Sequence, residues 1–127
     1  MKALLIVAHG SRRKESNDEV RRLADRIGEN AGPSFDKVTS AFLEISSPQL
    51  DSAIADLVDE GITEIMLFPY FLASGSHVKN DIPSIIEEQK NQYPNVSFSV
   101  LPHFGALQGI STLILNHIYK LAPLFSH

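Results

Sequence analysis

The chain has 127 residues, of which 43% are hydrophobic and 20% charged, as expected of one globular domain spanning residues 1–127. The absence of cysteine excludes disulfides, thiolate metal sites and a cysteine nucleophile. The net charge of −4 argues against nucleic acid as a partner, and the longest apolar runs are too short to span a membrane. The N-terminal segment has no signal-peptide pattern, so we expect a cytoplasmic protein.

Short β-rich runs alternate with helical patterns four times along the chain. The predicted strands cover residues 2–9, 37–44, 64–72 and 96–101. The predicted helices begin at a capping box at Ser16–Glu19, at Ser47-Pro48, at Asp81 and after Gly109. We expect the third strand to fray at Pro69, whose nitrogen cannot donate a ladder hydrogen bond. The apolar residues of the last helix are expected to face inward, with some left over for a contact between two copies of the chain; they are Ile110, Leu113, Ile114, Ile118 and Leu121.

This order of elements predicts an α/β fold with a four-stranded parallel sheet and helices on both faces. By analogy with doubly wound, flavodoxin-like sheets, we expect the strand order 2-1-3-4. Alternation of apolar and polar residues in the last strand is typical of a sheet edge. In such a sheet ligands bind beyond the carboxyl ends of the strands, next to the first and third strands.

Polar residues follow the predicted strands where each one ends. His9 ends the first strand, Glu44 ends the second, His77 lies in the loop after the third, and His103 follows the fourth. Two imidazoles and a carboxylate are a common ligand set for Fe, Co, Ni or Zn. Each residue alone is more often a solvated or hydrogen-bonded side chain. Their coincidence at one edge favours a metal site, with the role of His103 left open.

Basic residues lie beside His9 and His77. Arg12, Arg13 and Lys14 precede the first predicted helix, and Lys79 follows His77 by two residues. Local positive charge and a helix N-terminus suit a polyanionic ligand. A solvated run of charges is the alternative interpretation.

Three segments then show a specific resemblance. Ala8-His-Gly-Ser-Arg12, Ala41-Phe-Leu-Glu44 and the long segment Pro69–Pro83 resemble the class II chelatases, and more closely the short sirohydrochlorin chelatases of cobalamin and siroheme biosynthesis. The resemblance covers about residues 1–105, and the third segment is its most specific part.

The resemblance implies an enzyme that inserts a divalent metal, Co²⁺, Fe²⁺ or Ni²⁺, into sirohydrochlorin or a related tetrapyrrole without ATP. It implies His9 and His77 as metal ligands and proton acceptors, assisted by Glu44. The metal is then a substrate, no tightly bound cofactor is expected, and two copies pair as a homodimer. The residues expected to bind the tetrapyrrole are Ser11, Arg12, Arg13, Ser74, Gly75, Ser76 and Lys79.

Three other functions compete with this hypothesis. A carrier that binds a tetrapyrrole or metal without turnover would use the same ligands, and only catalysis separates it from a chelatase. A histidine phosphatase would carry Arg-His-Gly, whereas Ala8 precedes His9 here. A receiver-like signalling module would need acidic residues where His9 stands.

Overall fold

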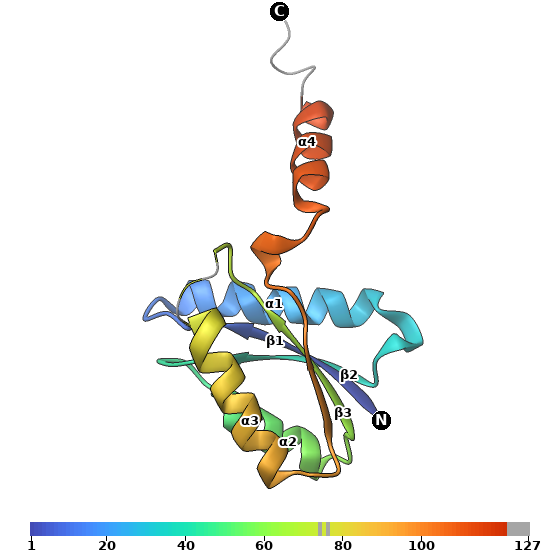
Figure 1. Cartoon of the computed structure of the whole chain (residues 1–127). Helices are drawn as coiled ribbons and strands as arrows, with labels where there is room; N and C mark the ends of the chain where they lie inside the picture. Colours follow the sequence, from blue (N-terminus) through green and yellow to red (C-terminus); the bar gives the residue numbers. More distant parts are fainter. Residues whose placement is uncertain (74, 76, 122–127) are drawn as a thin grey trace, which may run out of the picture.

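The computed structural model describes residues 1–73, 75 and 77–121, without the side chains of residues 77, 78 and 121. Four parallel strands form one sheet in the order β2-β1-β3-β4, which confirms the predicted fold class and strand order (Figure 1). The strands are β1 (Lys2–Ala8), β2 (Lys37–Phe42), β3 (Glu64–Pro69) and β4 (Ser97–Val100). As predicted, β3 ends at Pro69 and β4 lies at an edge of the sheet.

The main helices alternate with the strands. They are α1 (Lys14–Asn30), α2 (Leu50–Asp59), α3 (Ile82–Gln92) and α4 (Ile110–Leu121). A short π-helix, η2 (His77–Asp81), leads directly into α3, and a 3₁₀ turn, η3 (Phe104–Ala106), lies between β4 and α4. No helix in the described part of the chain is both long and apolar enough to cross a membrane.

The core lies on both faces of the sheet, and β1 contributes to both. Its odd-numbered residues from Ala3 to Val7 pack with α2 and α3, whereas the alternate residues Leu4, Ile6 and Ala8 pack with α1. All of them are buried. Burial on both faces explains why this strand is apolar at nearly every position.

Two predicted helix starts are wrong. Helix α1 begins at Lys14 with Arg13 as N-cap, so Ser16 lies inside its first turn and caps nothing. Helix α2 begins at Leu50, because Pro48 is tied to the end of β2: its carbonyl accepts a hydrogen bond from the Phe42 N–H at 2.9 Å. Asp81 does hold the N-cap position of α3, without a side-chain capping bond.

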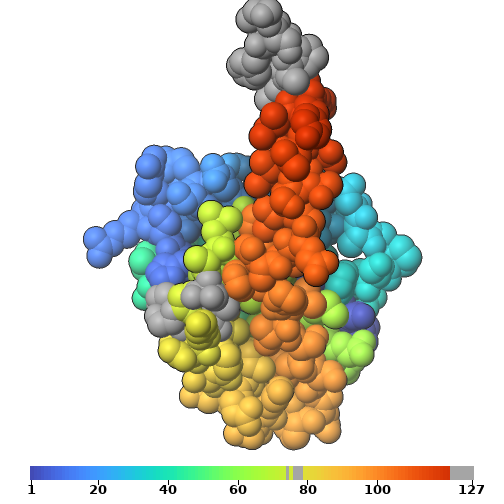
Figure 2. Space-filling model, turned by 45° about the horizontal axis from the view of Figure 1, so that its top comes forward, coloured from blue at the N-terminus to red at the C-terminus, as the bar shows by residue number. Residues whose placement is uncertain are grey.

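Helix α4 does not cover the sheet, contrary to the prediction. It projects away from the rest of the molecule, and every residue from 111 to 120 is exposed (Figures 1 and 2). The cause lies in η3, which is fixed against the loop after β3. The Gly105 N–H donates to the Phe71 carbonyl at 2.8 Å, and the Phe104 ring packs 5.4 Å from the Tyr70 ring. The chain therefore leaves the body of the molecule just before α4.

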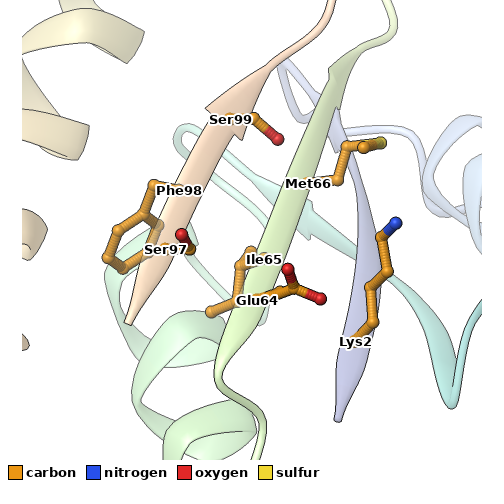
Figure 3. A pocket seen from close by; sticks show the side chains of 7 residues that line it. All are labelled: Lys2, Glu64, Ile65, Met66, Ser97, Phe98 and Ser99. Carbon is orange, nitrogen blue, oxygen red and sulfur yellow. The ribbon is translucent and has the colours of Figure 1, made fainter. Parts of the chain in front are cut away.

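The side of the sheet that carries α1 is only partly covered. Helix α1 packs over β2 and β1. Beside it, at the ends of β3 and β4 remote from the candidate site, lies an open hollow of about 130 Å³ (Figure 3). Its lining residues are Lys2, Glu64, Ile65, Met66, Ser97, Phe98 and Ser99.

Candidate functional site

His9 and Glu44 meet at the carboxyl ends of β1 and β2, as the sequence predicts. The His9 Nε2 atom lies 2.8 Å from the Glu44 Oε1 atom. Their side chains are 43% and 51% exposed, so both remain accessible to a ligand from solvent. An imidazole paired with a carboxylate can hold a divalent cation or accept a proton, and the carboxylate compensates the charge.

The backbone sets this distance, because the pairing of β1 with β2 continues past both strands. The Leu43 N–H donates to the Ala8 carbonyl at 3.0 Å, and the Glu44 N–H donates to the His9 carbonyl at 3.1 Å. Gly10 makes the approach possible: it has φ +98°, and a Cβ atom there would lie 1.9 Å from the Glu44 carbonyl oxygen. Only glycine fits this position without displacing the Glu44 backbone.

The turn after Glu44 is strained. Ile45 has φ +71°, which is unfavourable for a β-branched residue. The Ser46 N–H donates to the Glu44 carbonyl at 2.7 Å across this turn. A strained turn persists only where its surroundings hold it.

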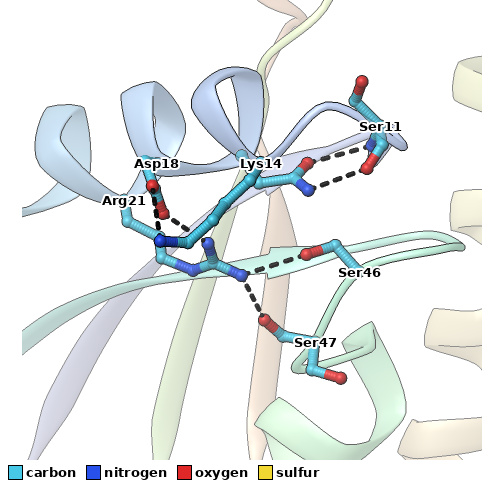
Figure 4. Close-up of polar contacts among 7 residues, drawn as sticks. Ser11, Lys14, Asp18, Arg21, Ser46 and Ser47 are labelled. Atoms are coloured by element: carbon cyan, nitrogen blue, oxygen red, sulfur yellow. Dashed lines mark hydrogen bonds and ion pairs between the residues drawn. The ribbon is translucent and has the colours of Figure 1, made fainter.

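Helix α1 contacts both loops through two side chains that were not predicted as site residues (Figure 4). Asn17 exchanges two hydrogen bonds with the Ser11 backbone, and Arg21 donates to Ser46 and Ser47. A spacing of four residues places Asn17 and Arg21 on one face of the helix. That spacing was visible in the sequence, but the loops they contact were not.

The predicted basic run lies at the start of α1. Arg12, Arg13 and Lys14 are all exposed, and the Lys14 Nζ atom is 3.9 Å from an Asp18 carboxylate oxygen. The hydroxyl of Ser11 accepts a hydrogen bond from the Arg13 N–H at 3.0 Å. Its own proton can still be donated to a ligand.

The loop after β3 carries the other predicted residues. Ser74 and Ser76 lie outside the described residues, and so does the side chain of His77. Gly75 is exposed and its carbonyl accepts from the Lys79 N–H at 3.1 Å. The Lys79 side chain is also exposed. The structure thus places His77 at the first position of η2, in the connection that follows β3, the neighbour of β1.

A cavity of about 240 Å³ lies between Glu44 and the segment that follows β3. It is lined by Leu43 and Glu44 from the end of β2, and by Asp81, Ser84 and Ile85 from the start of α3. The η2–α3 junction and Glu44 therefore line the same cavity. Among the described side chains, which do not include His77, no group of three or more His, Asp or Glu residues is close enough to hold a metal.

His103 does not join the pair through any contact that the structure shows. It is half-buried and is the N-cap of η3, where its carbonyl accepts from the Ala106 N–H at 2.9 Å. Its backbone thus has a structural role at the turn that leads toward α4.

The fold and the pair together define an α/β protein with a histidine–carboxylate site at the carboxyl edge of a parallel sheet. The CbiX family model matches residues 3–121. The chain belongs to this family. It is 31% identical over 118 residues to the sirohydrochlorin ferrochelatase of Priestia megaterium, covering 93% of this chain and 44% of that protein. It is 36% identical over 92 residues to the sirohydrochlorin cobaltochelatase of Sulfolobus acidocaldarius, covering 72% of each.

Solved structures agree with this assignment. The sirohydrochlorin chelatase SirB from Bacillus subtilis subspecies spizizenii, in complex with cobalt, is 26% identical with a TM-score of 0.80, covering 95% of this chain and 51% of that chain. A putative cobalamin biosynthesis CbiX protein from Marinobacter aquaeolei VT8 has a TM-score of 0.82 over 100% of this chain and 99% of that chain. At 22% identity the second match supports the fold alone. The chain spans less than two-thirds of the length of several curated relatives, among them the Priestia ferrochelatase.

Proposed function

We propose that this chain is a sirohydrochlorin metal chelatase, which inserts a divalent metal into sirohydrochlorin or a related tetrapyrrole without ATP. The single observation that carries the proposal is the His9–Glu44 pair, 2.8 Å apart and accessible at the carboxyl edge of the sheet. Relatives named for this activity with iron and with cobalt support it. The same fold holds cobalt in SirB.

Insertion requires three tasks of the protein: to take the metal from water, to present it to the ring, and to accept two pyrrole protons. His9 and His77 are proposed to hold the metal and accept protons, because a neutral imidazole does both near neutral pH. Glu44 is proposed to orient His9 and to offset positive charge. The metal is a substrate in this scheme, and no tightly bound cofactor is proposed.

The physiological metal is Co²⁺, Fe²⁺ or Ni²⁺, all of which suit imidazole and carboxylate ligands. The chain contains no cysteine. Ligands of this intermediate softness release a metal more readily than thiolates do, as transfer requires. The relatives are named for both iron and cobalt, so metal supply and not the donor set is proposed to decide the choice.

The tetrapyrrole is proposed to bind over the same edge of the sheet. Its carboxylate arms suit the exposed cations Arg12, Arg13 and Lys79. The hydroxyl of Ser11 and the loop containing Ser74, Gly75 and Ser76 would supply further hydrogen bonds. The cytoplasm is the proposed compartment.

A homodimer is proposed to enclose the ring. The carboxyl edge of one small sheet leaves the ring open to solvent on one side. A second copy of the chain covering that side would help to exclude water from the metal. Helix α4 supports this proposal, because Leu113, Ile114 and Ile118 are 63%, 52% and 52% exposed. Exposed apolar side chains gathered on one element mark a protein contact, and a twofold pair would cover both copies of α4 at once.

The decisive experiment is anaerobic incubation with sirohydrochlorin and each metal in turn, followed by absorbance. A rate well above the spontaneous rate supports the chelatase. Tight binding of tetrapyrrole or metal at the spontaneous rate would identify a carrier and contradict the proposal.

A further inference from the structure

Two side chains on one face of α1 hold the two loops that carry His9 and Glu44. Asn17 contacts the loop after β1. Arg21, one helical turn further on, contacts the loop after β2 (Figure 4). Helix α1 is itself fixed to the sheet, where Val20 and Ala24 are buried against β1 and β2. A rigid element thus contacts both halves of the candidate site.

Asn17 is buried, at 8% exposure, and uses both ends of its amide. Its Oδ1 atom accepts from the Ser11 N–H at 2.9 Å, and its Nδ2 atom donates to the Ser11 carbonyl at 2.8 Å. This two-point contact fixes the backbone on both sides of Ser11, two residues after His9. Aspartate lacks the donor and alanine lacks both groups, so neither can replace the amide.

Arg21 holds the second loop in a similar way. One guanidinium nitrogen donates to the Ser46 hydroxyl at 3.0 Å and to the Ser47 carbonyl at 2.9 Å. The other nitrogen is fixed by Asp18 at 2.9 Å. The guanidinium also lies 5.1 Å from the centre of the Phe42 ring, at the end of β2. A planar fork with several donors can make these contacts together, whereas lysine cannot.

The second loop needs this support because Ile45, next to Glu44, has a strained backbone with φ +71°. Arg21 contacts the two residues that follow Ile45. Without those contacts the turn is expected to relax, and relaxation at Ile45 would rotate the adjacent Glu44. The His9–Glu44 contact cannot prevent this, because both side chains are half exposed and exposed pairs of this kind contribute little.

We propose that Asn17 and Arg21 are positioning residues, which fix the relative orientation of His9 and Glu44 through their loops without touching substrate. The proposal rests on the proposed chelatase function, which gives the pair its purpose. Outer residues that orient a metal ligand typically change metal affinity or activity by about 10- to 100-fold when removed.

The experiment compares Asn17→Ala and Arg21→Ala with the control Arg22→Ala. Arg22 is an exposed arginine on the same helix, so its replacement removes the same charge as Arg21→Ala. Metal insertion and the affinity for Co²⁺ alone are measured anaerobically, well below each melting temperature. We expect kcat and Co²⁺ affinity to fall about 10- to 100-fold in the first two variants. The KM for sirohydrochlorin should change little, and Arg22→Ala should match wild type.

A second variant separates positioning from folding. Asparagine tolerates a positive φ better than isoleucine. Ile45→Asn should therefore restore part of the Co²⁺ affinity lost in Arg21→Ala, and it should not rescue Asn17→Ala, which acts on the other loop.

The outcomes distinguish this inference from the proposed function. If wild type inserts no metal, the chelatase proposal fails, and Co²⁺ affinity still tests the positioning. If folded Asn17→Ala and Arg21→Ala keep wild-type kcat and Co²⁺ affinity, the positioning inference is overturned. An equal loss in Arg22→Ala would also overturn it, by showing a general effect of charge on α1.

Discussion

The loops after β1 and β2 and the helix α4 are built in opposite ways. The two loops carry polar side chains and are held by backbone bonds, by Gly10 and by two residues of α1. Helix α4 carries exposed apolar side chains, and each residue from 111 to 120 faces solvent. The polar loops are stabilised by contacts within one chain. An exposed apolar surface instead indicates a contact with another surface.

The two regions therefore differ in what they are proposed to bind: the loops a metal, and α4 a second copy of the chain. The His9–Glu44 pair already has its geometry, and in the proposed function His9 binds the metal together with His77 while Glu44 orients His9. Helix α4 is exposed along residues 111–120 of the described chain, and the proposed second copy would cover it. Changes at the loops should therefore act on chemistry, and changes at α4 should act on assembly.

The largest effect is expected at the histidines. His9→Ala should reduce the insertion rate by about 10²- to 10⁴-fold, because it removes a metal ligand and a proton acceptor. His77→Ala should do the same. The melting temperature of His9→Ala should stay near wild type, since its side chain is 43% exposed. Wild-type insertion rates in either variant would contradict a site made of two histidines.

Gly10→Ala tests whether the backbone approach makes the site. The added Cβ would lie 1.9 Å from the Glu44 carbonyl oxygen, so the two loops must separate. We expect insertion to fall by at least tenfold and stability to fall by about 1–3 kcal/mol in urea unfolding. Gly61→Ala is the matched control: Gly61 has φ +92° but nothing near its missing Cβ. It should lose stability alone, and equal losses of activity in both variants would refute the assignment.

Glu44→Gln should have a smaller effect, because the residue is proposed to assist His9 and not to hold the metal. We expect a reduction of the insertion rate of about tenfold, within the range for outer groups at metal sites. Glu60→Gln is the control, since Glu60 is a half-exposed glutamate in an ion pair with Lys37 at 2.6 Å, outside the site. Insertion by Glu44→Gln at the rate of this control would exclude a role for the carboxylate.

Replacing Leu113, Ile114 and Ile118 with Gln tests the other region. Sedimentation should show the triple variant as a monomer of about 14.0 kDa, whereas wild type should sediment as the proposed dimer. The insertion rate should fall several-fold, because the second copy of the chain no longer covers the site. Thr112→Gln with Asn116→Gln changes exposed polar positions on the same helix and should leave the dimer intact. A fully active wild-type monomer would refute the dimer.

The sequence predicted the parts of the molecule that follow from local patterns. Continuous apolar runs predicted the strands, and the residues at strand ends predicted the meeting of His9 with Glu44. The helix starts at Ser16 and Ser47 were wrong, because tertiary contacts at Ser11 and Phe42 outweigh local capping. Strain at Ile45 and the supporting residues of α1 depend on how the loops meet, which no periodicity reveals.

The predicted position of α4 was wrong for a related reason. Apolar residues at helical spacing indicate that a helix will be buried, but not whether its own sheet or another chain will bury it. The contacts of η3 that direct α4 outward involve Phe71 and Gly105, two residues far apart in the sequence.

The smallest effect is expected at the basic run, which is exposed like α4 but polar like the loops. Replacing Arg12, Arg13 and Lys14 with Gln should raise the KM for sirohydrochlorin about three- to tenfold, which corresponds to roughly 0.2–0.5 kcal/mol for each of the three exposed charges. The chemical rate should change little, because these charges attract carboxylates equally before and during reaction. The effect should shrink at high salt.

The control replaces the exposed residues Arg22, Arg26 and Lys90, which removes the same net charge elsewhere. An equal rise in KM in both triple variants would mean that net charge attracts the substrate. Lower thermal stability with unchanged KM would mean that the run only begins helix α1.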